Sequence, residues 1–381
     1  MKNIDFQSLT GRGRLFPDGE VVLALSGGVD SAVAAFILKE QGLKVQAVHL
    51  VFHDKPDATA SALDLARRLE LDLRLLDIKE EFERLVVEPF ARAYVQGRTP
   101  SPCVACNPLI KFGLLADLTG AEHLATGHYA GLAPSWPGPG FHLVRPRDRV
   151  KDQTYFLSRL TPNMLARAVF PLAGLTKDQV RAKAAALGLE EKPESQEICF
   201  LKGLDYRGFL RDRFGDDALT PGDFVDPSGK VVGRHEGIAA YTVGQRRGLG
   251  LPGVFPYYVL KLDPLKNQVV VGPRELTFSR RFLVRAPVWS QAIAGPEFRA
   301  LAQIRSRHQP APAVVTVRPD RDLDVCFDQP QPSIASGQAA AFYEGDRLLG
   351  GGWIENVISD TPPPEPVEKD ARSWPGIRRD R

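Results

Sequence analysis

Residues 21–31, Val-Val-Leu-Ala-Leu-Ser-Gly-Gly-Val-Asp-Ser, decide the fold of the first part of the chain. An apolar run stops at Ser26, and after two glycines a helical pattern of apolar residues begins. This pattern predicts a strand, a glycine loop and a helix N-terminus, where main-chain N–H groups and the helix dipole together favour an anion. The glycines let the main chain approach that anion closely. We therefore expect a phosphate site in which Ser26 and Ser31 add hydroxyl donors and Asp30 can hold Mg²⁺.

The hexamer Ser-Gly-Gly-Val-Asp-Ser at residues 26–31 resembles the loop of the PP-loop ATP pyrophosphatases. The chain has neither the Gly-Lys-Ser/Thr of a Walker A loop nor the Gly-x-Gly-x-x-Gly of dinucleotide sites at this position. The resemblance implies cleavage of ATP between its α- and β-phosphates, with adenylation of a substrate oxygen. The alternative that needs no ligand is a tight strand-to-helix turn capped by Ser31 or Asp30.

Length and composition bound the class of protein. A chain of 381 residues exceeds one ordinary core, so two or three domains are expected. The composition, with 43% hydrophobic and 25% charged residues, is typical of a globular protein. A net charge of only +3 means that any nucleic acid must bind a local basic surface. Since we find neither an apolar run of membrane-spanning length nor a signal peptide, we expect a cytoplasmic protein without membrane contact.

Strand-like and helix-like segments alternate in the first half of the chain. Strands are predicted over 21–25, 45–52, 73–78 and 123–129, and helices over 31–41, 59–70, 109–120, 152–169 and 176–188. The last helix opens with a capping box formed by Thr176 and Gln179. The alternation predicts an α/β fold with a parallel sheet, whose ligands bind at the carboxyl ends of the strands.

After about residue 205 the chain becomes β-rich. Turn signals at 226–229, 263–267 and 344–346 predict hairpins, and short strands recur from about 280 to 356. We expect four regions, namely an N-terminal ATP-binding catalytic domain, a small central β-rich domain, a C-terminal β-barrel and a disordered tail. Their expected bounds are 1–205, 206–277, 278–358 and 359–381.

Two of the four cysteines form a Cys-x-x-Cys pair. Prolines at 100, 102 and 108 surround Cys103 and Cys106 and predict a stiff loop rather than a regular helix. Such a pair is typical of zinc, an iron–sulfur cluster or thiol redox chemistry. His128 is a candidate fourth zinc ligand, but its place beside the expected nucleotide site disfavours zinc. We interpret Cys326, in a strand-like run, as a packing residue, and His49 and His53 as structural.

Several motifs in fixed order resemble one family, the tRNA-specific 2-thiouridylases (MnmA/TrmU). They are the hexamer at 26–31, Gly-Arg-Thr-Pro-Ser-Pro-x-x-x-Cys-Asn at 97–107, Ala-Thr-Gly-His-Tyr at 125–129, Lys-Asp-Gln at 151–153, Glu-Ile-Cys-Phe at 197–200 and Tyr-Thr-Val-Gly-Gln-Arg-Arg-Gly-Leu-Gly at 241–250. The resemblance covers about residues 20 to 356. It implies conversion of the wobble uridine of tRNA to 2-thiouridine, with release of pyrophosphate and AMP. Adenylation makes chemical sense because a uracil oxygen is a poor leaving group until it carries AMP.

The resemblance also assigns roles to individual residues. It places ATP against Ala24, Leu25, Ser26, Gly27, Gly28, Val29, Asp30, Ser31, Leu50 and Gly127. Cys106 corresponds to the nucleophile and Cys199 to the persulfide carrier. The expected tRNA contacts are Ser101, Pro102, Cys103, His128, Lys151, Asp152, Gln153, Arg305, Ser306 and Gln338. The implied partners are tRNA and a sulfur donor such as a cysteine desulfurase or a sulfur-relay protein.

Two departures from the family pattern bear on the mechanism. Many members have an aspartate, the proposed acid/base, where this chain has Cys103, and the segment 51–57 is shorter than usual. The change at Cys103 leaves two sulfur mechanisms open. In one, Cys106 attacks a persulfide on Cys199 and forms a disulfide with it. In the other, Cys103, Cys106 and Cys199 hold a [4Fe–4S] cluster whose open iron binds sulfide.

Two other classes of function compete with this interpretation. One is a different adenylating PP-loop enzyme, such as a tRNA cytidine thiolase or an amidotransferase. The other is a tRNA-binding protein without catalysis, and the intact hexamer at 26–31 disfavours it. Basic clusters at 245–250 and 305–308 are candidate phosphate contacts in either tRNA-binding case.

Overall fold

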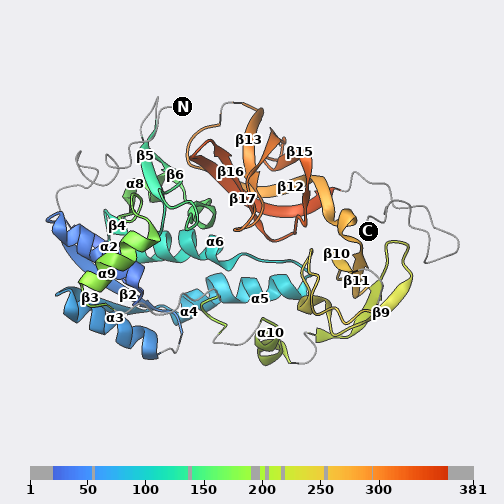
Figure 1. The fold of residues 1–381 in the computed structure, drawn as a ribbon, viewed down its shortest axis with the longest axis horizontal. Helices are drawn as coiled ribbons and strands as arrows, with labels where there is room; N and C mark the ends of the chain where they lie inside the picture. The colour runs from blue at the N-terminus through green and yellow to red at the C-terminus, as the bar shows by residue number, and fades with distance from the viewer. Residues whose placement is uncertain are drawn as a thin grey trace, which may run out of the picture.

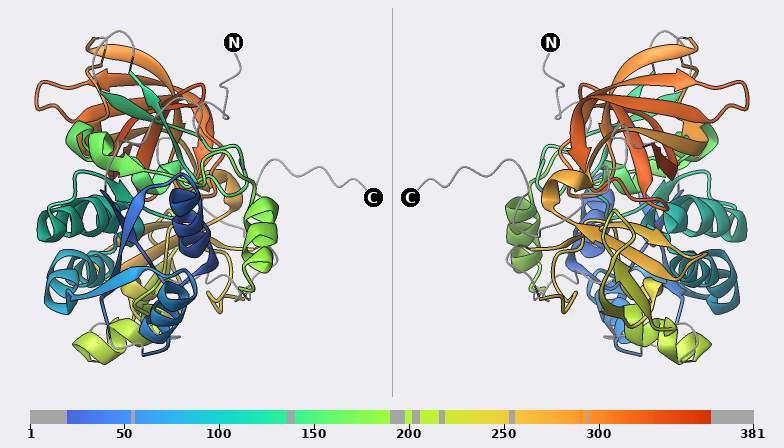
Figure 2. Two further views of the ribbon diagram at one scale, coloured as in Figure 1. Left: turned by 90° about the vertical axis from the view of Figure 1, so that its left-hand side faces the viewer. Right: turned by 90° about the vertical axis from the view of Figure 1, so that its right-hand side faces the viewer.

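The protein is described by a computed structural model that places residues 20–358, apart from the segments 54–55, 136–139, 190–197, 202–205, 216–218, 253–255 and 294. The tail 359–381, which we expected to be disordered, lies outside the described residues. Three β-sheets organise the rest: a parallel sheet, a small central sheet and a large antiparallel sheet (Figure 1). In side views the antiparallel sheet lies above the other two (Figure 2).

The parallel sheet has five strands in the order β3-β2-β1-β4-β7. They are β1 (Glu20–Ala24), β2 (Lys44–Val51), β3 (Asp72–Asp77), β4 (Leu124–Ala125) and β7 (Ala168–Val169). Val21 and Leu23 of β1 belong to one buried cluster, and Val22 between them belongs to another. Because side chains alternate along a strand, both faces of the sheet are covered, which explains the unbroken apolar run. The predicted α/β fold with a parallel sheet is confirmed.

Helices cover both faces of this sheet. On the face of Val21 lie α2 (Val29–Glu40), α3 (Pro56–Arg68) and α9 (Lys177–Ala186). The other face is covered by α4 (Lys79–Phe82), the π-helical segment η1 (Glu83–Val87), α5 (Glu88–Val95) and α7 (Leu115–Thr119). Helix α9 begins with the predicted capping box, in which Thr176 and Gln179 exchange side-chain-to-backbone hydrogen bonds. This box fixes where Lys177 enters the helix.

The prediction that prolines exclude a helix around Cys103 and Cys106 is wrong. Both cysteines lie in α6 (Pro102–Cys106), which continues into the π-helical segment η2 (Asn107–Leu114). Pro102 stands in the first turn, where a missing N–H is not needed. Pro108 stands near the start of η2, and we attribute the wider π-turn to its ring. The pair therefore sits on a helix end rather than on a loop.

The predicted helix over 152–169 is wrong for most of its length. The segment consists of a 3-10 turn η3 (Thr154–Leu157), the short helix α8 (Pro162–Arg167) and strand β7. Helix α8 begins anew because the Thr161 hydroxyl caps it, accepting from the Met164 N–H. Strand β7 then pairs with β4. Of the strand predicted over 123–129, only Leu124–Ala125 is in the sheet.

The second half of the chain forms the predicted β-rich regions. Helix α10 (Tyr206–Phe214) precedes a sheet of order β10-β11-β8-β9, made of β8 (Gly222–Val225), β9 (Val231–His235), β10 (Tyr258–Asp263) and β11 (Gln268–Gly272). The barrel consists of β12 (Phe278–Trp289), β13 (Glu297–Gln303), β14 (Ala311–Val317), β15 (Leu323–Pro332), β16 (Ala339–Glu344) and β17 (Arg347–Ile358). Pairing of β12 with β17 closes these six antiparallel strands. Two 3-10 turns complete the described elements, η5 (Ile238–Ala240) and η6 (Arg274–Thr277). The three predicted hairpins are β8–β9, β10–β11 and β16–β17.

One hairpin, β5 (Gly131–Pro134) with β6 (Phe141–Val144), has no counterpart among the predicted elements. It follows β4 in the chain but pairs through Val144 with Arg347 of the barrel strand β17. The Arg145 N–H continues this contact to the Asp346 carbonyl at 2.9 Å. The hairpin thus ties the parallel-sheet region to the barrel. Within the described residues, no helix is long and apolar enough to cross a membrane.

Candidate functional site

The loop between β1 and α2 is shaped by its own hydroxyl groups. The Ser31 hydroxyl donates to the Gly28 carbonyl at 2.8 Å and accepts from the Ser26 N–H at 3.2 Å. Gly28 caps α2 without a side-chain cap hydrogen bond, which leaves N–H groups of the first turn for a ligand at the positive end of this helix. Gly27 has φ +85° and an added Cβ would lie 2.9 Å from the Ala58 carbonyl oxygen. The geometry and the donors of this loop fit a bound phosphate.

Asp30, in the first turn of α2, is held by two side chains from elsewhere. Its Oδ1 accepts from the Lys177 ammonium at 2.8 Å and from the Tyr129 hydroxyl at 2.9 Å. The Lys177 side chain is only 6% exposed. The carboxylate expected to approach Mg²⁺ is therefore paired with a buried cation. Sequence reasoning missed Lys177 because this residue follows the N-cap Thr176, and the capping box alone accounts for the polar residues at this helix start.

The loop after β4 faces both the phosphate loop and the cysteine helix. A Cβ added to Gly127 would lie 2.9 Å from the Ser31 nitrogen, so this position packs directly on the start of α2. The next residue, His128, has its Nε2 3.4 Å from the Lys111 ammonium of η2. Two successive residues therefore connect the expected ATP site with the helix that carries Cys106. Leu50, the expected adenine neighbour, is buried near the carboxyl end of β2.

His128 has a defined protonation state. A lysine ammonium can only donate, so Nε2 of His128 accepts from Lys111 and its Nδ1–H donates to the Thr126 hydroxyl at 2.7 Å. Burial lowers the pKa of His128 well below its usual value, and the charge of Lys111 lowers that pKa further. At neutral pH this imidazole is uncharged.

Cys103 and Cys199 both act electrostatically on Cys106. Burial raises the pKa of the Cys106 thiol to about 12; Lys111 opposes this rise, while Cys199 and Cys103 add to it. Burial also raises the pKa of Cys103, again opposed by Lys111. Residues five apart lie about 140° apart around an α-helix, but the i→i+5 bonding of a π-turn brings Lys111 towards the side of Cys106. The fold thus brings the three predicted cysteines together, and Lys111 lies beside two of them, Cys103 and Cys106.

The short segment that carries Cys199 is anchored by aromatic rings and by His53. Phe200 contacts Phe82 and Phe90 with ring centroids 5.9 and 5.0 Å apart. His53 Nε2 lies 3.0 Å from the Cys199 carbonyl oxygen. From its sequence alone His53 has only a structural interpretation, because nothing there connects it with a cysteine 146 residues away. Glu197, from the same motif, lies outside the described residues.

The thiols as placed do not fit a metal centre. Across the described part of the chain, no three His, Cys, Asp or Glu side chains are arranged to hold a metal ion. None of the four cysteines, all of which the structure describes, is part of a disulfide. Cys326 lies on β15, away from the motif cysteines in the fold as in the sequence.

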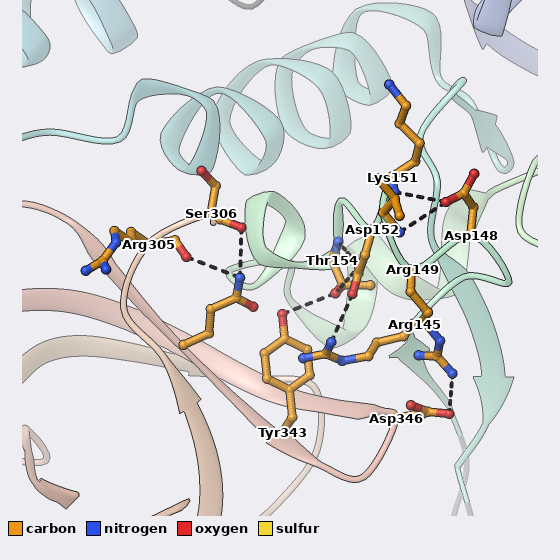
Figure 3. Close-up of polar contacts among 12 residues, drawn as sticks. Arg145, Asp148, Arg149, Lys151, Asp152, Thr154, Arg305, Ser306, Tyr343 and Asp346 are labelled. Carbon is orange, nitrogen blue, oxygen red and sulfur yellow. Dashed lines mark hydrogen bonds and ion pairs between the residues drawn. The ribbon is translucent and has the colours of Figure 1, made fainter. Parts of the chain in front are cut away.

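The predicted tRNA motif 151–153 is mostly engaged inside the protein (Figure 3). Asp152 accepts from the Thr154 N–H and hydroxyl at 2.9 and 2.6 Å, and Arg145 lies 3.4 Å from its other oxygen. The Arg145 guanidinium covers the Tyr343 ring of the barrel at 4.3 Å. The Lys151 side chain points away from this pair in Figure 3. We infer that, of these three side chains, Lys151 is the one best placed to reach a phosphate.

The barrel contributes its predicted residues around one buried tyrosine. The Tyr155 hydroxyl donates to the Gln338 side chain at 3.3 Å and to the Ala339 carbonyl at 3.0 Å. Burial raises the pKa of Tyr155, which a hydrogen bond with Ser101 and the charge of Arg305 both oppose. Arg305 donates to the Pro332 carbonyl at 2.9 Å, and Ser306 is exposed beside it. Ser101, Arg305 and Gln338, far apart in sequence, therefore lie around the same side chain.

Comparison with known proteins gives a consistent result. Residues 19–203 match the family described as "tRNA methyl transferase HUP domain", 207–273 its "PRC-barrel domain", and 279–354 "Aminomethyltransferase beta-barrel domain". A "tRNA-specific 2-thiouridylase MnmA" of Geobacter metallireducens is 43% identical over 361 residues, covering 89% of this chain and 98% of that protein. The protein of the same description from Desulforudis audaxviator is 45% identical, over 89% of this chain and 99% of its own length. A solved 4-thiouridine synthetase–RNA complex with bound ATP is 20% identical over 52% of this chain and 51% of that chain, with a TM-score of 0.35, a similarity too slight to bear on fold or function.

Proposed function

The chain belongs to the tRNA-specific 2-thiouridylase family, and we propose that it thiolates the wobble uridine of tRNA through an adenylated base and a cysteine persulfide. The protein is a tRNA sulfurtransferase that converts uridine to its 2-thio form. The observation that carries the proposed mechanism is the pair Gly127 and His128. The first packs on the phosphate loop, and the second contacts Lys111 beside the thiols.

In the first half-reaction ATP binds at the loop 26–31. The N-terminus of α2 and the hydroxyls of Ser26 and Ser31 would hold its phosphates, and Asp30 would approach Mg²⁺. The 2-oxygen of the uridine attacks the α-phosphate and pyrophosphate leaves. The base has to leave its stack to reach this site, and Ser101, Pro102 and Cys103 are the proposed contacts of the extruded ring.

In the second half-reaction sulfur replaces the adenylated oxygen. The terminal sulfur of a persulfide on Cys199 bonds to C2, and AMP leaves with the electron pair of the C2–O bond. The Cys106 thiolate then attacks Sγ of Cys199, and the S–S bond breaks with its electrons going to the sulfur on C2. The base takes up a proton at N3, matching the proton lost by Cys106. A disulfide between Cys106 and Cys199 results, which a thiol reductant must reopen, and a sulfur donor such as a cysteine desulfurase or a sulfur-relay protein reloads Cys199.

The cluster alternative is disfavoured because the three thiols, as the described residues place them, do not form a metal-holding group. In the persulfide scheme, Cys103 does not replace the acid/base aspartate of other members, because desolvation raises the pKa of its thiol. It acts instead as a wall of the base pocket. Lys151, Arg305 and Ser306 are the proposed phosphate contacts of the tRNA.

The test compares three serine variants in the presence of tRNA, ATP and a sulfur donor. Cys106→Ser and Cys199→Ser should form no 2-thiouridine, by mass spectrometry of nucleosides, while tRNA-dependent pyrophosphate release continues. Cys326→Ser is the matched control and should thiolate normally. Thiolation by either of the first two variants refutes the scheme. If the unmodified protein releases no pyrophosphate with tRNA, it is a tRNA-binding protein without this catalysis, and if activity follows iron content, the cluster route is correct.

A further inference from the structure

Lys177 is a buried cation at the phosphate loop that the scheme above does not use. Its ammonium group lies 2.8 Å from Asp30 Oδ1, and its side chain is 6% exposed whereas that of Asp30 is 34% exposed. A lysine is rarely buried to this degree without a partner charge. The pair places one positive and one negative group at the start of α2, where a triphosphate is expected.

The main chain of Lys177 is held by a different loop. Its N–H donates to Asp148 Oδ2 at 2.8 Å. The other oxygen of Asp148 accepts from the N–H groups of Val150 and Lys151, both at 3.1 Å. One carboxylate thus fixes both the first residue of α9 and the turn that presents Lys151, as Figure 3 shows for the Lys151 side.

A second connection joins the same two places. Tyr129, whose hydroxyl donates to Asp30, also exchanges two hydrogen bonds with Gln153. The Tyr129 N–H donates to Gln153 Oε1 at 2.9 Å, and the Gln153 N–H donates to the Tyr129 carbonyl at 3.0 Å. Both partners of Asp30 are therefore attached to the loop 148–153, which contains the proposed tRNA contact Lys151.

We propose that Lys177 is an ATP-binding residue that transfers from Asp30 to a phosphate when nucleotide binds, and that Asp148 links this transfer to the tRNA loop 148–153. The proposal rests on ATP binding at the loop 26–31. An arriving Mg²⁺ competes with the ammonium for the Asp30 carboxylate, since both are cations and oxygen is the preferred ligand of Mg²⁺. The released ammonium is then beside the phosphate oxygens, so no buried charge is left without a partner. No bond other than these ionic contacts changes.

The first experiment measures affinity for a non-hydrolysable ATP analogue with Mg²⁺ by calorimetry. Lys177→Met should weaken binding at least about tenfold, because Asp30 then repels the triphosphate. Lys177→Arg should retain most of the affinity. The matched control is Lys183→Met on the same helix, where Lys183 lies over the Phe36 ring and away from Asp30. Melting temperatures of all variants separate loss of binding from loss of folding. Equal affinity in Lys177→Met and the unmodified protein refutes the proposal, whereas no binding by the unmodified protein refutes ATP binding itself.

The second experiment tests the link. We define the coupling factor as the ratio of tRNA affinity with the ATP analogue to tRNA affinity without it. If the two sites are coupled, this factor exceeds one, and tRNA raises the affinity for the analogue by the same factor. Asp148→Asn retains one acceptor oxygen and exchanges the other for a donor. Asp148→Asn should reduce the coupling factor to one, while the affinity for the analogue in the absence of tRNA changes by less than about threefold. A factor that persists in Asp148→Asn overturns the linking role, as does a factor of one in the unmodified protein.

Discussion

Gln338 of the barrel donates its side-chain amide to the carbonyl of Thr99, 3.0 Å away, at the entrance to the cysteine helix. The Thr99 N–H donates in turn to the Ser336 carbonyl at 2.8 Å. The barrel therefore holds both polar groups of one peptide residue that stands four positions before Cys103. A residue expected to touch tRNA therefore also holds the segment that leads into α6, the helix of Cys103 and Cys106.

Gln338→Ala tests which of these roles dominates. Removing the amide leaves the Thr99 carbonyl without this donor and the Tyr155 hydroxyl without one of its acceptors. The loop before α6 is then no longer held in place by the barrel. We expect kcat for thiolation to fall about tenfold while the Kd for tRNA changes less than about threefold. Gln329→Ala, on the exposed part of β15, is the control. A large rise in Kd at unchanged kcat would show that Gln338 acts mainly as an RNA contact.

Arg305→Ala should weaken tRNA binding through a lost phosphate contact. The side chain is half-buried, which lowers its pKa, yet it stays charged and close to Tyr155. Loss of one phosphate contact should reduce the slope of log affinity against log salt by about one. Arg299→Ala, in the same barrel and paired with Asp328, provides the matched comparison. An unchanged salt slope would remove Arg305 from the interface.

Gly127→Ala should distort the loop 26–31 through a steric clash. The new Cβ would lie 2.9 Å from the Ser31 nitrogen and from the Asp30 carbonyl carbon, both main-chain atoms that cannot turn aside. We expect the free energy of unfolding to fall by about 1–3 kcal/mol and ATP affinity to fall with it. Gly295→Ala, where an added Cβ meets nothing within 4 Å, should leave both within error. Chemical denaturation of the two variants measures the difference.

The sequence predicted what depends on local pattern and missed what depends on distant pairing. The apolar run of β1 and the turns at Asp226, Asp263 and Gly345 encode their own structures, and these were predicted correctly. Pro102 and Pro108 led to the wrong prediction of a loop at Cys103 and Cys106, because a proline is tolerated in the first turn of a helix or in a wider π-turn.

The partners of the site residues could not be derived in the same way. Asp30 with Lys177, and His53 with Cys199, are separated by 147 and 146 residues and meet only through the fold. The hairpin β5–β6 carries no sign in its own sequence that it pairs, through Val144, with Arg347 of the last barrel strand. The positions of the motif residues were therefore predictable from the sequence, whereas their partners Lys177 and His53 were not.

The reactivity of Cys106 should depend on pH and on the charge of Lys111. Burial raises its pKa to about 12, so the free protein holds a thiol at neutral pH and alkylation by iodoacetamide should accelerate as pH rises towards that value. Because the charge of Lys111 opposes this rise, Lys111→Met should raise the pKa of Cys106 further. Alkylation at pH 9 should then slow, about tenfold if the pKa of the thiol increases by about one.

Peptide-resolved mass spectrometry of Cys106 across a pH series measures this effect without tRNA or ATP. Lys111→Arg preserves the charge, so its profile should lie close to that of the unmodified protein, and Lys44→Met, at an exposed ion pair with Glu20, should leave the profile unchanged. Nitrogen NMR of His128 gives a second readout, since its Nδ1–H tautomer is fixed by the Lys111 donor. Equal profiles for Lys111→Met and Lys111→Arg would mean that the side chain supports the π-helical turn by packing, and that its charge does not reach the thiol.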